Sequence, residues 1–451
     1  MRSSRGRSAA SATRHDTATD RGPSDRALRL HRRSDRVDTA RMNDPDLVVV
    51  GGGIAGGTFA TVMAWAGANV LVLERQAEYR DRVRGELMWP WGVAEVQRLG
   101  LEDVFRRAGA NVADRFESHD EGTAAETPVV QADLSAEVAG APGSINLFHP
   151  TATRALADAA TAAGARVVYG AHEATIATAP PTVAWTDGDG RHEVRCGLIV
   201  GADGRSSTVR AQAGIELHKD PPAHLATGML VKGLDAVDDR TDLVARGNDL
   251  LFLSFPQGGG RARVYFCMPT GQRDRFAGAD AAQRFLKAAT LVPSLPGPER
   301  WAAATPAGPC ATFTCEDTWV DRPYADGVVL IGDAGGHNNP LIGQGLSLAV
   351  RDAGVLADLL RTEGSRTPAV LEAYGVERTE RLRRARISCL VDTWANDGFH
   401  VQDPQERSRR YERTQVDEIL AALMDAQWKG FDLVPRTPSD DEAHERLFAN
   451  A

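Results

Sequence analysis

The sequence predicts an α/β fold in which a largely parallel sheet is interrupted by an antiparallel, sheet-rich insertion and followed by a helical C-terminal region. Near the start, an apolar strand at 46–50 leads through a glycine turn into a helix and then into a second strand at 70–74, which is the order of a βαβ unit. Residues 250–255 and 261–268 flank three consecutive glycines, a pattern typical of an antiparallel hairpin. The final third of the chain has the apolar periodicity of helices.

The segments between these elements alternate between helix and strand. We expect Thr151 to cap a helix that is followed by a strand at 166–169. A hairpin that turns at 187–190 leads into a further strand at 196–200. After the insertion, the chain returns to a strand at 327–331 and then to an amphipathic helix. The apolar face of this helix is expected to contain Leu346, Ala349, Val350, Ala353, Leu356 and Leu360.

Length, charge and cysteine usage exclude several classes of protein. The 451 residues exceed one ordinary domain, and the net charge of −9 disfavours nucleic acid as a partner. The apolar stretches are shorter than the roughly 18 residues that a membrane span requires, so no span is expected. The five cysteines are scattered and no secretory signal precedes them, which favours a reducing cytoplasm. Cys310 and Cys315 should lie on opposite faces of one strand and therefore form no redox pair.

The first glycine turn has the spacing of a dinucleotide-binding fingerprint. Gly51 permits the tight turn, Gly53 lets the backbone approach a pyrophosphate, and Gly56 lets the helix pack on the strand. The carboxylate of Glu74 suits a free ribose 2′-hydroxyl and would repel a 2′-phosphate, which indicates FAD or NAD rather than NADP. The residues expected to contact the cofactor here are Gly51, Gly53, Ala55, Gly56, Glu74 and Arg75.

A second glycine-rich segment at 332–347 decides between FAD and NAD. It follows a strand, and its Asp333 can hold the hydroxyls of a sugar alcohol. It opens a helix near Gly345, whose unpaired N–H groups and positive dipole end favour negative charge. Such a helix end near N1 and O2 of a flavin stabilises the anionic reduced ring, which an enzyme that uses NAD alone would not require. The two segments together predict a Rossmann-like FAD-binding domain.

With these motifs in order, the sequence resembles the para-hydroxybenzoate-hydroxylase-like (group A) family of FAD monooxygenases. The family pattern is Gly-Asp-Ala-Ala-His, three residues, Pro, two residues, Gly-x-Gly-x-Asn. The family's His position is Gly336, with His337 one step later, and its Asn position is Ser347. The positions that match in register are Gly332, Asp333, Ala334, Pro340, Gly343 and Gly345.

The resemblance extends over residues 46–390 and implies further contacts. The segment 201–210 is similar to the family's Asp-Gly motif, which serves both FAD and NAD(P)H and is represented by Asp203 and Gly204. Arg84 is similar to a family arginine near the pyrophosphate, and Arg154 lies where the family has another FAD-side arginine. The resemblance also implies that Pro340 and Gly343 form the wall beside the reactive ring edge.

These expectations divide the chain into five parts. Residues 1–41 have almost no large apolar side chains and are expected to be a disordered tail. Residues 42–215 are assigned to the FAD-binding domain with part of the substrate layer, and 216–315 to a sheet-rich substrate domain. Residues 316–390 form the second part of the FAD-binding domain. The C-terminal helical region covers 391–451.

The family resemblance implies a mechanism in which the flavin carries the chemistry. NAD(P)H would bind transiently, because only one dinucleotide fingerprint is present, and would reduce non-covalently bound FAD. Reaction with O₂ would give a flavin C4a-hydroperoxide, which hydroxylates or epoxidises a small organic, aromatic or polycyclic substrate. Neither a metal nor a side-chain nucleophile is expected.

Two other functions stay open, and two features have competing interpretations. The glycines at 335–336 are similar to the motif of geranylgeranyl-reductase-like flavoproteins, which reduce unsaturated substrates, and a non-catalytic flavin-binding regulator is the third possibility. Trp89-Pro90-Trp91 is similar to the Trp-x-Trp of flavin halogenases, but it lies too early in the chain, so we expect packing near the flavin or substrate. His149 is either the family's ring-side polar residue or a buried structural histidine.

Overall fold

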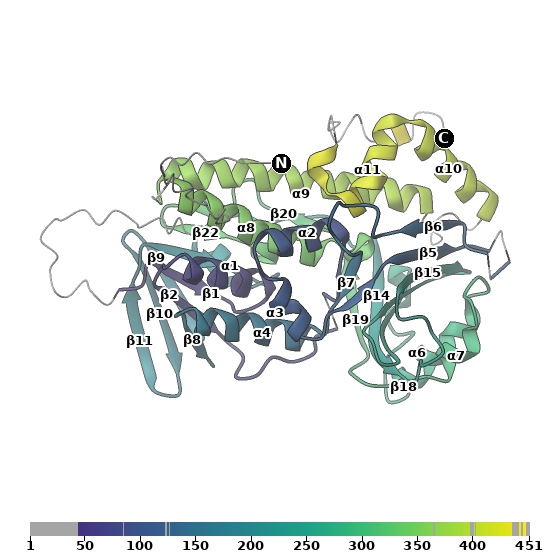
Figure 1. Cartoon of the computed structure of the whole chain (residues 1–451), viewed down its shortest axis with the longest axis horizontal. Helices are drawn as coiled ribbons and strands as arrows, with labels where there is room; N and C mark the ends of the chain where they lie inside the picture. The colour runs from purple at the N-terminus through teal and green to yellow at the C-terminus, as the bar shows by residue number, and fades with distance from the viewer. Residues whose placement is uncertain are drawn as a thin grey trace, which may run out of the picture. The chain divides into compact units, whose positions relative to one another are not determined.

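The computed structural model describes residues 44–447, with gaps at 84, 122–123, 126, 364–365, 397–400, 402, 435–441 and 443–444. The expected tail at 1–41 and the expected pyrophosphate contact Arg84 therefore lie outside the described residues. The described part is an α/β fold with a mainly parallel sheet, an antiparallel sheet and C-terminal helices (Figure 1). This confirms the predicted fold class.

The mainly parallel sheet has six strands in the order β21-β22-β12-β1-β2-β8. Its central strands are short apolar runs that are buried along their whole length, as expected for strands covered on both faces. β21 pairs with β22 in antiparallel orientation and closes one edge. The strands are β1 (Leu47–Val50), β2 (Val70–Glu74), β8 (Arg166–Tyr169), β12 (Leu198–Gly201), β21 (Tyr324–Ala325) and β22 (Val328–Leu330).

Different layers cover the two faces of this sheet. On one face, Leu47 and Val49 join a core that also contains residues of α1 (Ile54–Trp65), α4 (His149–Ala162) and α8 (Gly345–Glu363). On the other face, Val48 and Val50 pack in a core with Val183 and Trp185 of a small antiparallel sheet. That sheet consists of β9 (His172–Thr178), β10 (Pro181–Asp187) and β11 (Gly190–Arg195).

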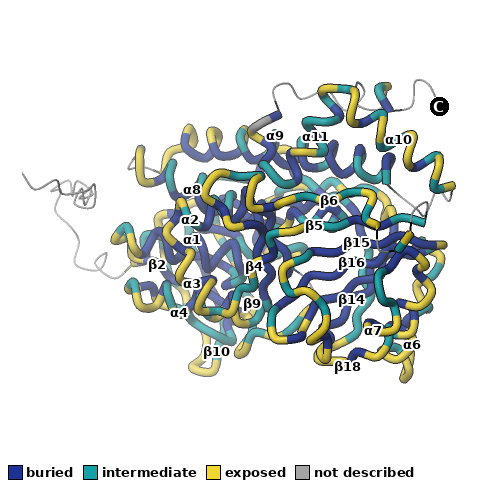
Figure 2. Tube along the Cα trace, turned by 45° about the vertical axis from the view of Figure 1, so that its right-hand side comes forward, coloured by how far each residue is buried: buried dark blue, intermediate teal, exposed yellow. Residues whose placement is uncertain are grey.

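The second large sheet has eight strands and forms the sheet-rich layer. The chain reaches it twice, because β5 and β6 come from the segment before α4 and β5 pairs in parallel with β15. Figure 2 shows β14, β15 and β16 coloured as buried along most of their length. The strands are β5 (Arg115–His119), β6 (Val130–Asp133), β14 (His224–Lys232), β15 (Thr241–Gly247), β16 (Leu250–Pro256), β17 (Arg261–Met268), β18 (Thr305–Pro306) and β19 (Ala311–Cys315).

Side chains alternate between the two faces of this second sheet, as the pleat requires. On β17, Val264 and Phe266 pack in a core with α6 (Ala281–Lys287) and α7 (Pro298–Ala302). Tyr265 belongs instead to a second core, which contains Trp89, Trp91 and residues of the C-terminal helices. Cys310 packs against the first of these cores and Cys315 lies in the second, and all five cysteines are free. The prediction that the two thiols lie on opposite faces is therefore confirmed.

The C-terminal helices pack on one another and on the first half of the chain. They are α9 (Pro368–Asn396), α10 (Pro404–Val416) and α11 (Glu418–Lys429). The side chains of Asp403 and Asp417 accept hydrogen bonds from the first turns of α10 and α11, which is why these helices begin there. No helix within the described ranges is long and apolar enough to cross a membrane.

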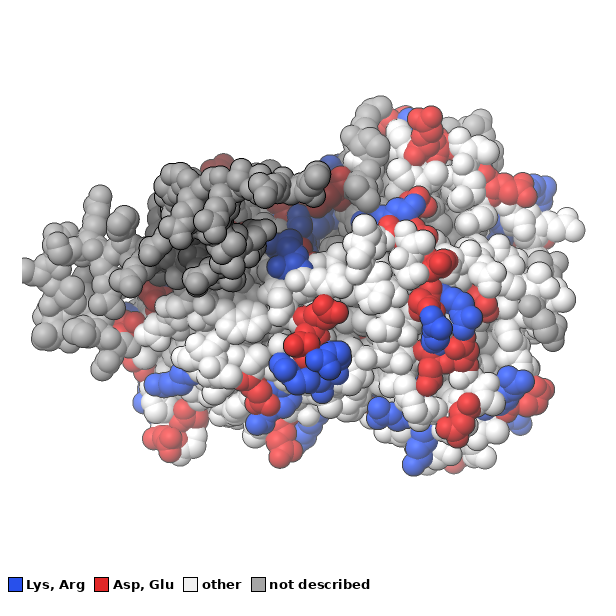
Figure 3. Space-filling model, in the orientation of Figure 1, with Lys and Arg blue, Asp and Glu red and all other residues white. Residues whose placement is uncertain are grey.

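Short elements connect these layers. The helical ones are α2 (Pro90–Arg98), α3 (Glu102–Arg107), α5 (Thr208–Gln212), η2 (Thr270–Gln272), η3 (Ala288–Leu291), η4 (Gly332–Gly335), η5 (Pro340–Ile342) and η6 (Phe431–Leu433). The short strands are β3 (Leu87–Met88), β4 (Asn111–Ala113), β7 (Ser144–Asn146), β13 (His218–Lys219) and β20 (Thr318–Trp319). On the face drawn in Figure 3, acidic and basic side chains are interspersed rather than gathered by sign.

The N-terminal cap predicted for the helix near Thr151 is wrong. α4 begins at His149, with Phe148 as its capping residue and Pro150 in its first turn. Proline fixes the backbone angle φ that a helix start requires, so the helix begins before the threonine. The hydroxyl of Thr151 donates instead to the carbonyl oxygens of Phe148 and Ala108, both at 2.9 Å. The strands predicted at 46–50, 70–74, 166–169 and 327–331 are confirmed within one residue at each end.

Candidate functional site

Of the three fingerprint glycines that follow β1, namely Gly51, Gly53 and Gly56, only Gly53 has open space beside its Cα atom. A Cβ placed on Gly51 would lie 2.3 Å from the carbonyl oxygen of Ala202, and one on Gly56 would lie 2.0 Å from the carbonyl oxygen of Gly51. Packing within the protein therefore explains both glycines. A Cβ on Gly53 would meet no atom within 4 Å. The space in front of Gly53 fits the close approach of a pyrophosphate to the backbone.

Glu74 lies at the end of β2 and faces the same turn. One carboxylate oxygen accepts a hydrogen bond from the Gly52 N–H at 2.8 Å, and the other accepts one from the Gln76 N–H at 2.7 Å. A carboxylate oxygen can accept two hydrogen bonds, so each oxygen keeps a position for a ribose hydroxyl. The predicted location of Glu74 beside the fingerprint is thus confirmed by the geometry.

Tyr79 was not predicted from the sequence, although it lies at the Glu74 end of the turn. Its hydroxyl donates to the Gly52 carbonyl oxygen at 2.9 Å, and burial raises its pKa above the usual value. Its ring packs edge-on against Tyr169, with the ring centroids 6.0 Å apart. Arg154 lies over the Tyr169 ring at 5.6 Å and pairs with Asp158 at 2.9 Å. The structure therefore places Arg154 near the C-terminal ends of β2 and β8, where Glu74 and Tyr169 lie side by side.

The Asp-Gly segment after β12 packs against the glycine turn. Asp203 accepts hydrogen bonds from the Ser207 hydroxyl at 2.5 Å and from the Thr208 N–H at 2.7 Å, so it holds the first turn of α5, whose capping residue is Ser207. A Cβ on Gly204, whose φ is +79°, would meet no atom within 4 Å. Of the other predicted contacts, Ala55 is buried and Arg75 is exposed.

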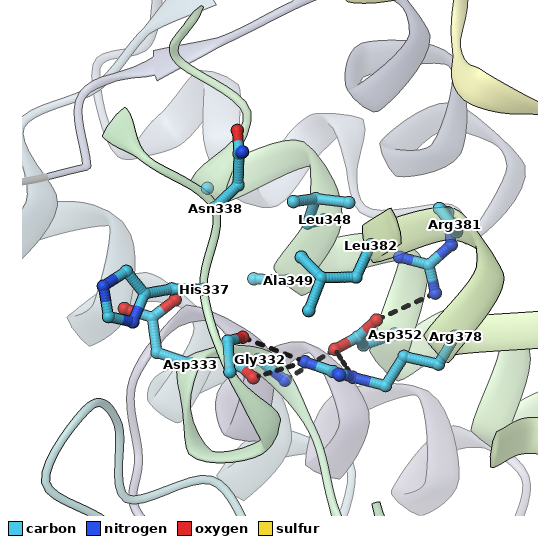
Figure 4. Close-up of a pocket in the computed structure, with 12 residues that line it drawn as sticks. Gly332, Asp333, His337, Asn338, Leu348, Ala349, Asp352, Arg378, Arg381 and Leu382 are labelled. Carbon is cyan, nitrogen blue, oxygen red and sulfur yellow. Dashed lines mark hydrogen bonds and ion pairs between the residues drawn. The ribbon is translucent and has the colours of Figure 1, made fainter. Parts of the chain in front are cut away.

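The loop Gly332–Gly336 carries Asp333 beside α1. A Cβ on Gly332 would lie 2.8 Å from the Cβ of Ala55, so this loop touches the first fingerprint. The Asp333 carboxylate accepts a hydrogen bond from Arg205 Nε at 3.2 Å and is partly exposed. Behind the loop lie Asp352, Arg378 and Arg381, which the sequence did not indicate and which line a small cavity with it (Figure 4).

The structure gives a physical reason for the displaced histidine of the second motif. Gly336 has a φ of +103°, and a Cβ there would lie 2.5 Å from the carbonyl oxygen of Thr318. A histidine therefore does not fit at this position. His337 is buried next to it, with its N–H donating to the Thr318 hydroxyl at 3.0 Å and its Nδ1 2.7 Å from the same oxygen.

The segment from Pro340 to Gly345 packs against the Trp-Pro-Trp sequence. Gly343 has a φ of +65°, and a Cβ there would lie 2.7 Å from Leu87 Cδ2. Trp89 Nε1 donates to the Ile342 carbonyl oxygen at 2.8 Å. Trp91 Nε1 donates to the side-chain oxygen of Gln344 at 3.0 Å. The two tryptophans therefore support this segment by packing and hydrogen bonding.

Gly345 is the first residue of α8, and a Cβ there would meet no atom within 4 Å. The N-terminus of this helix is therefore unobstructed at Gly345. His149 lies close by, because a Cβ on Gly85 would be 3.3 Å from both the His149 ring and the Leu346 side chain. Burial, with a smaller contribution from Arg82, lowers the pKa of His149 to about 4, so the imidazole is neutral at pH 7.

A buried polar cluster lies on the face of the second sheet that carries Tyr265. Arg263 is fully buried and pairs with Asp81 at 2.8 Å and with Glu86 at 3.1 Å. The hydroxyl of Tyr265 donates to the other carboxylate oxygen of Glu86. Burial raises the pKa of Glu86 and of Tyr265, so both groups favour their protonated forms more than in water. Asp81 and Glu86 are far in the chain from Arg263 and Tyr265, and none of the four belongs to a motif, so this cluster could not be predicted from the sequence.

The arrangement defines a class of protein. One end of the site has a glycine turn with the carboxylate of Glu74 beside it, and the other has an open helix N-terminus beside a loop that carries an aspartate. The residues therefore fit a dinucleotide that has a charge-accepting ring, which is the chemistry of FAD. Among the described residues, no group of histidine, cysteine and acidic side chains could hold a metal ion.

Comparisons with known proteins agree with this class. The family model described as "FAD binding domain" matches residues 44–386. The chain is 29% identical over 383 residues to 6-methylpretetramide 4-monooxygenase of Streptomyces rimosus, covering 76% of this chain and 82% of that protein. It is 28% identical over 346 residues to digeranylgeranylglycerophospholipid reductase 2 of Methanopyrus kandleri, covering 73% and 81%. The fold is similar to that of p-nitrophenol 4-monooxygenase from Pseudomonas putida DLL-E4, with a TM-score of 0.72, 20% identity, and coverage of 87% and 99%.

The chain belongs to this FAD-binding family, because the family model covers more than half of it. It is an FAD-dependent oxidoreductase of the aromatic-hydroxylase type. The predicted family, cofactor and enzyme class are therefore confirmed.

Proposed function

We propose that this protein is a monooxygenase that uses NAD(P)H and O₂ to insert one oxygen atom into a planar aromatic or polycyclic substrate, by hydroxylation or epoxidation. The observation that carries the proposal is the open N-terminus of α8 at Gly345, which lies next to the segment held by Trp89 and Trp91. Bound FAD would supply the redox chemistry by accepting hydride and activating O₂. The protein supplies orientation, electrostatics and exclusion of water.

The adenosine half of FAD is assigned to the first fingerprint. Gly53 offers the backbone to the pyrophosphate, and Glu74 accepts the ribose hydroxyls. Arg84, outside the described residues, and Arg154 are assigned to the FAD side on the family resemblance. The full set proposed for this half is Gly51, Gly53, Ala55, Gly56, Glu74, Arg75, Arg84, Arg154, Asp203 and Gly204.

The flavin half is assigned to the second motif. Asp333 holds the ribityl hydroxyls, and Pro340 with Gly343 forms the wall beside the reactive ring edge. Backbone N–H groups near Gly345 face the pyrimidine of the ring. Reduction adds negative charge there, and a preformed helix end stabilises that charge without reorganisation. These N–H groups therefore raise the tendency of the flavin to accept hydride.

A cluster of three aromatic side chains from three elements supports the proposal of a planar substrate. Trp89, Phe116 and Trp428 contact one another, with ring centroids 5.5 to 6.5 Å apart. They come from the start of α2, from β5 and from α11, so one C-terminal helix contributes to this aromatic cluster. Edge-on and offset contacts between rings favour planar aromatic partners. The relative from Streptomyces rimosus is named for a 4-monooxygenation of 6-methylpretetramide, which supports a polycyclic substrate.

A flavoprotein reductase of an unsaturated substrate is the second candidate function. The observation in its favour is the glycine at 336, together with 28% identity to digeranylgeranylglycerophospholipid reductase 2. A reductase would use the same FAD contacts as a monooxygenase, but its formation of product would consume no O₂. A non-catalytic flavin-binding regulator would not oxidise NAD(P)H faster when substrate is added. A cytoplasmic location, favoured by the five free cysteines, is part of the proposal.

Substrate-stimulated NAD(P)H oxidation tests the proposed function. Purified protein should retain FAD that heat or acid releases. Addition of polycyclic phenols should accelerate the oxidation of NADH or NADPH, with O₂ consumed in equal amount. Acceleration without O₂ consumption would assign the protein to the reductases. No acceleration by any member of a broad aromatic panel would contradict the proposed substrate class.

A further inference from the structure

A buried charged cluster holds the Gly332–Gly336 loop from behind. The cluster consists of Asp352 on α8 and of Glu377, Arg378 and Arg381 on α9, and we call it the Arg378 cluster. Figure 4 shows Arg378 and Asp333 on opposite sides of the Gly332 backbone. The side chains of Asp352, Arg378 and Arg381 are all at most 4% exposed. Such buried charges persist only where partners satisfy them.

Arg378 donates to three carbonyl oxygens of this one loop. Its Nη1 donates to Gly335 at 2.8 Å, and its Nη2 donates to Gly332 at 2.9 Å and to Gly336 at 3.1 Å. Its Nε donates to Asp352 at 2.8 Å. The planar guanidinium thus fixes the orientation of the loop's peptide groups, because its donors cannot move independently.

Asp352 holds the same loop through an N–H group. One carboxylate oxygen accepts from the Gly332 N–H at 2.8 Å as well as from Arg378. Its other oxygen accepts from Arg381 at 2.8 Å. Arg381 also pairs with Glu377, and none of its hydrogen bonds in the described residues goes to a loop atom. Arg378 and Arg381 are therefore two buried arginines that both pair with Asp352. Within the described residues, only Arg378 donates hydrogen bonds to the loop.

Gly335 allows the guanidinium to lie directly against the loop. A Cβ on Gly335 would lie 2.9 Å from Cζ of Arg378, closer than such atoms pack. The family pattern has alanine at this position, whereas this chain has glycine. The arginine cannot easily retreat from an added methyl group, because four hydrogen bonds hold it.

We propose that Arg378 is a positioning residue that sets how this loop and the adjoining N-terminus of α8 meet the flavin. The inference rests on the proposed placement of the flavin at Asp333 and Gly345. Arg378 donates to three carbonyl oxygens from the side of the loop opposite Asp333. These hydrogen bonds fix the backbone conformation that orients the Asp333 carboxylate. Asp352 lies on α8 itself, so the same cluster ties the loop to the helix whose N-terminus faces the ring. Loss of Arg378 then changes the electrostatic environment of the ring as well as FAD affinity.

The test compares Arg378→Met with Arg381→Met. Each substitution removes one buried guanidinium from Asp352, but only the first releases the loop. We expect Arg378→Met to weaken FAD binding by about tenfold or more, equivalent to about 1.4 kcal/mol, and to shift the midpoint potential of the bound flavin. Arg381→Met should lower the thermal stability of the apoprotein while leaving the potential close to that of the wild type. Equal shifts in the two variants, or a wild-type potential in Arg378→Met, would overturn the proposal.

A second variant keeps the test decisive if Arg378→Met does not fold. Gly335→Ala keeps every charge and forces the loop away from the guanidinium, so the potential should shift in the same direction as in Arg378→Met. An unchanged potential in Gly335→Ala would contradict the proposal. The measurement needs bound FAD and no substrate, so failure to find a hydroxylated product would count against the proposed function and leave this inference standing.

Discussion

Removal of the Glu74 carboxylate should separate its role toward FAD from its role in the fold. In Glu74→Ala, the ribose hydroxyls lose a charged acceptor, which is worth about 1.5 to 3 kcal/mol. FAD should therefore bind roughly 10- to 150-fold more weakly. The structure adds a second cost, because the buried Gly52 N–H loses its partner at 2.8 Å. That loss should lower the stability of the apoprotein by about 1 to 3 kcal/mol.

Titration of apoprotein with FAD, followed by flavin fluorescence, measures the first effect, and thermal unfolding of the apoprotein measures the second. Glu74→Gln is the matched control, because its amide oxygen still accepts from one backbone N–H while the charge is lost. Its affinity should lie between those of the wild type and the alanine variant. Reduced apoprotein stability with unaltered FAD affinity in Glu74→Ala would show that the ribose does not lie at the end of β2.

Two further substitutions test the flavin end and the core. Gly345→Leu should leave the apoprotein folded, because the added side chain faces open space, yet it should lower the flavin midpoint potential and slow reduction by NAD(P)H. Wild-type values for both would place the ring elsewhere. Asp242 lies on β15, is fully buried and accepts hydrogen bonds from the side chains of Ser144 and Asn146. Burial raises the pKa of Asp242 from 3.8 to about 7. The folded state therefore holds a proton that the unfolded state releases, and stability falls as pH rises between these values. Relative to Asp242→Asn, the wild type should lose up to about 4 kcal/mol of unfolding free energy from pH 4 to pH 7. Parallel pH profiles would show that Asp242 stays ionised.

Local sequence patterns were sufficient to predict the FAD-binding half of the fold. The strand, glycine turn, helix and second strand are encoded within residues 46–74, where each element is specified by neighbouring residues. The same holds for the helix that begins at Gly345. The sequence was less informative about the exact residue at which a helix begins, because both a proline and a threonine can mark a helix start. Pro150 starts α4 at an earlier residue than the Thr151 cap that we predicted.

Contacts between distant parts of the chain were beyond such patterns. β5 joins the second sheet by pairing in parallel with β15, although more than a hundred residues separate the two strands. The Arg378 cluster joins two helices to a glycine loop, and an arginine on a long helix is usually solvated. Arg263 and Glu86 meet only because the second sheet lies against the segment before β3. These residues form no local sequence motif, so their contacts become evident only in the folded structure.

Isotope labelling of the oxygenated product tests the central claim most directly. The purified protein, loaded with FAD and supplied with NAD(P)H and a polycyclic aromatic substrate that stimulates oxidation, would be incubated under ¹⁸O₂ in ordinary water. Mass spectrometry of the product should show one heavy oxygen atom per molecule, since a monooxygenase transfers one atom of O₂ and releases the other as water. A product that carries oxygen from the solvent, or a reduced product without added oxygen, would contradict the assignment.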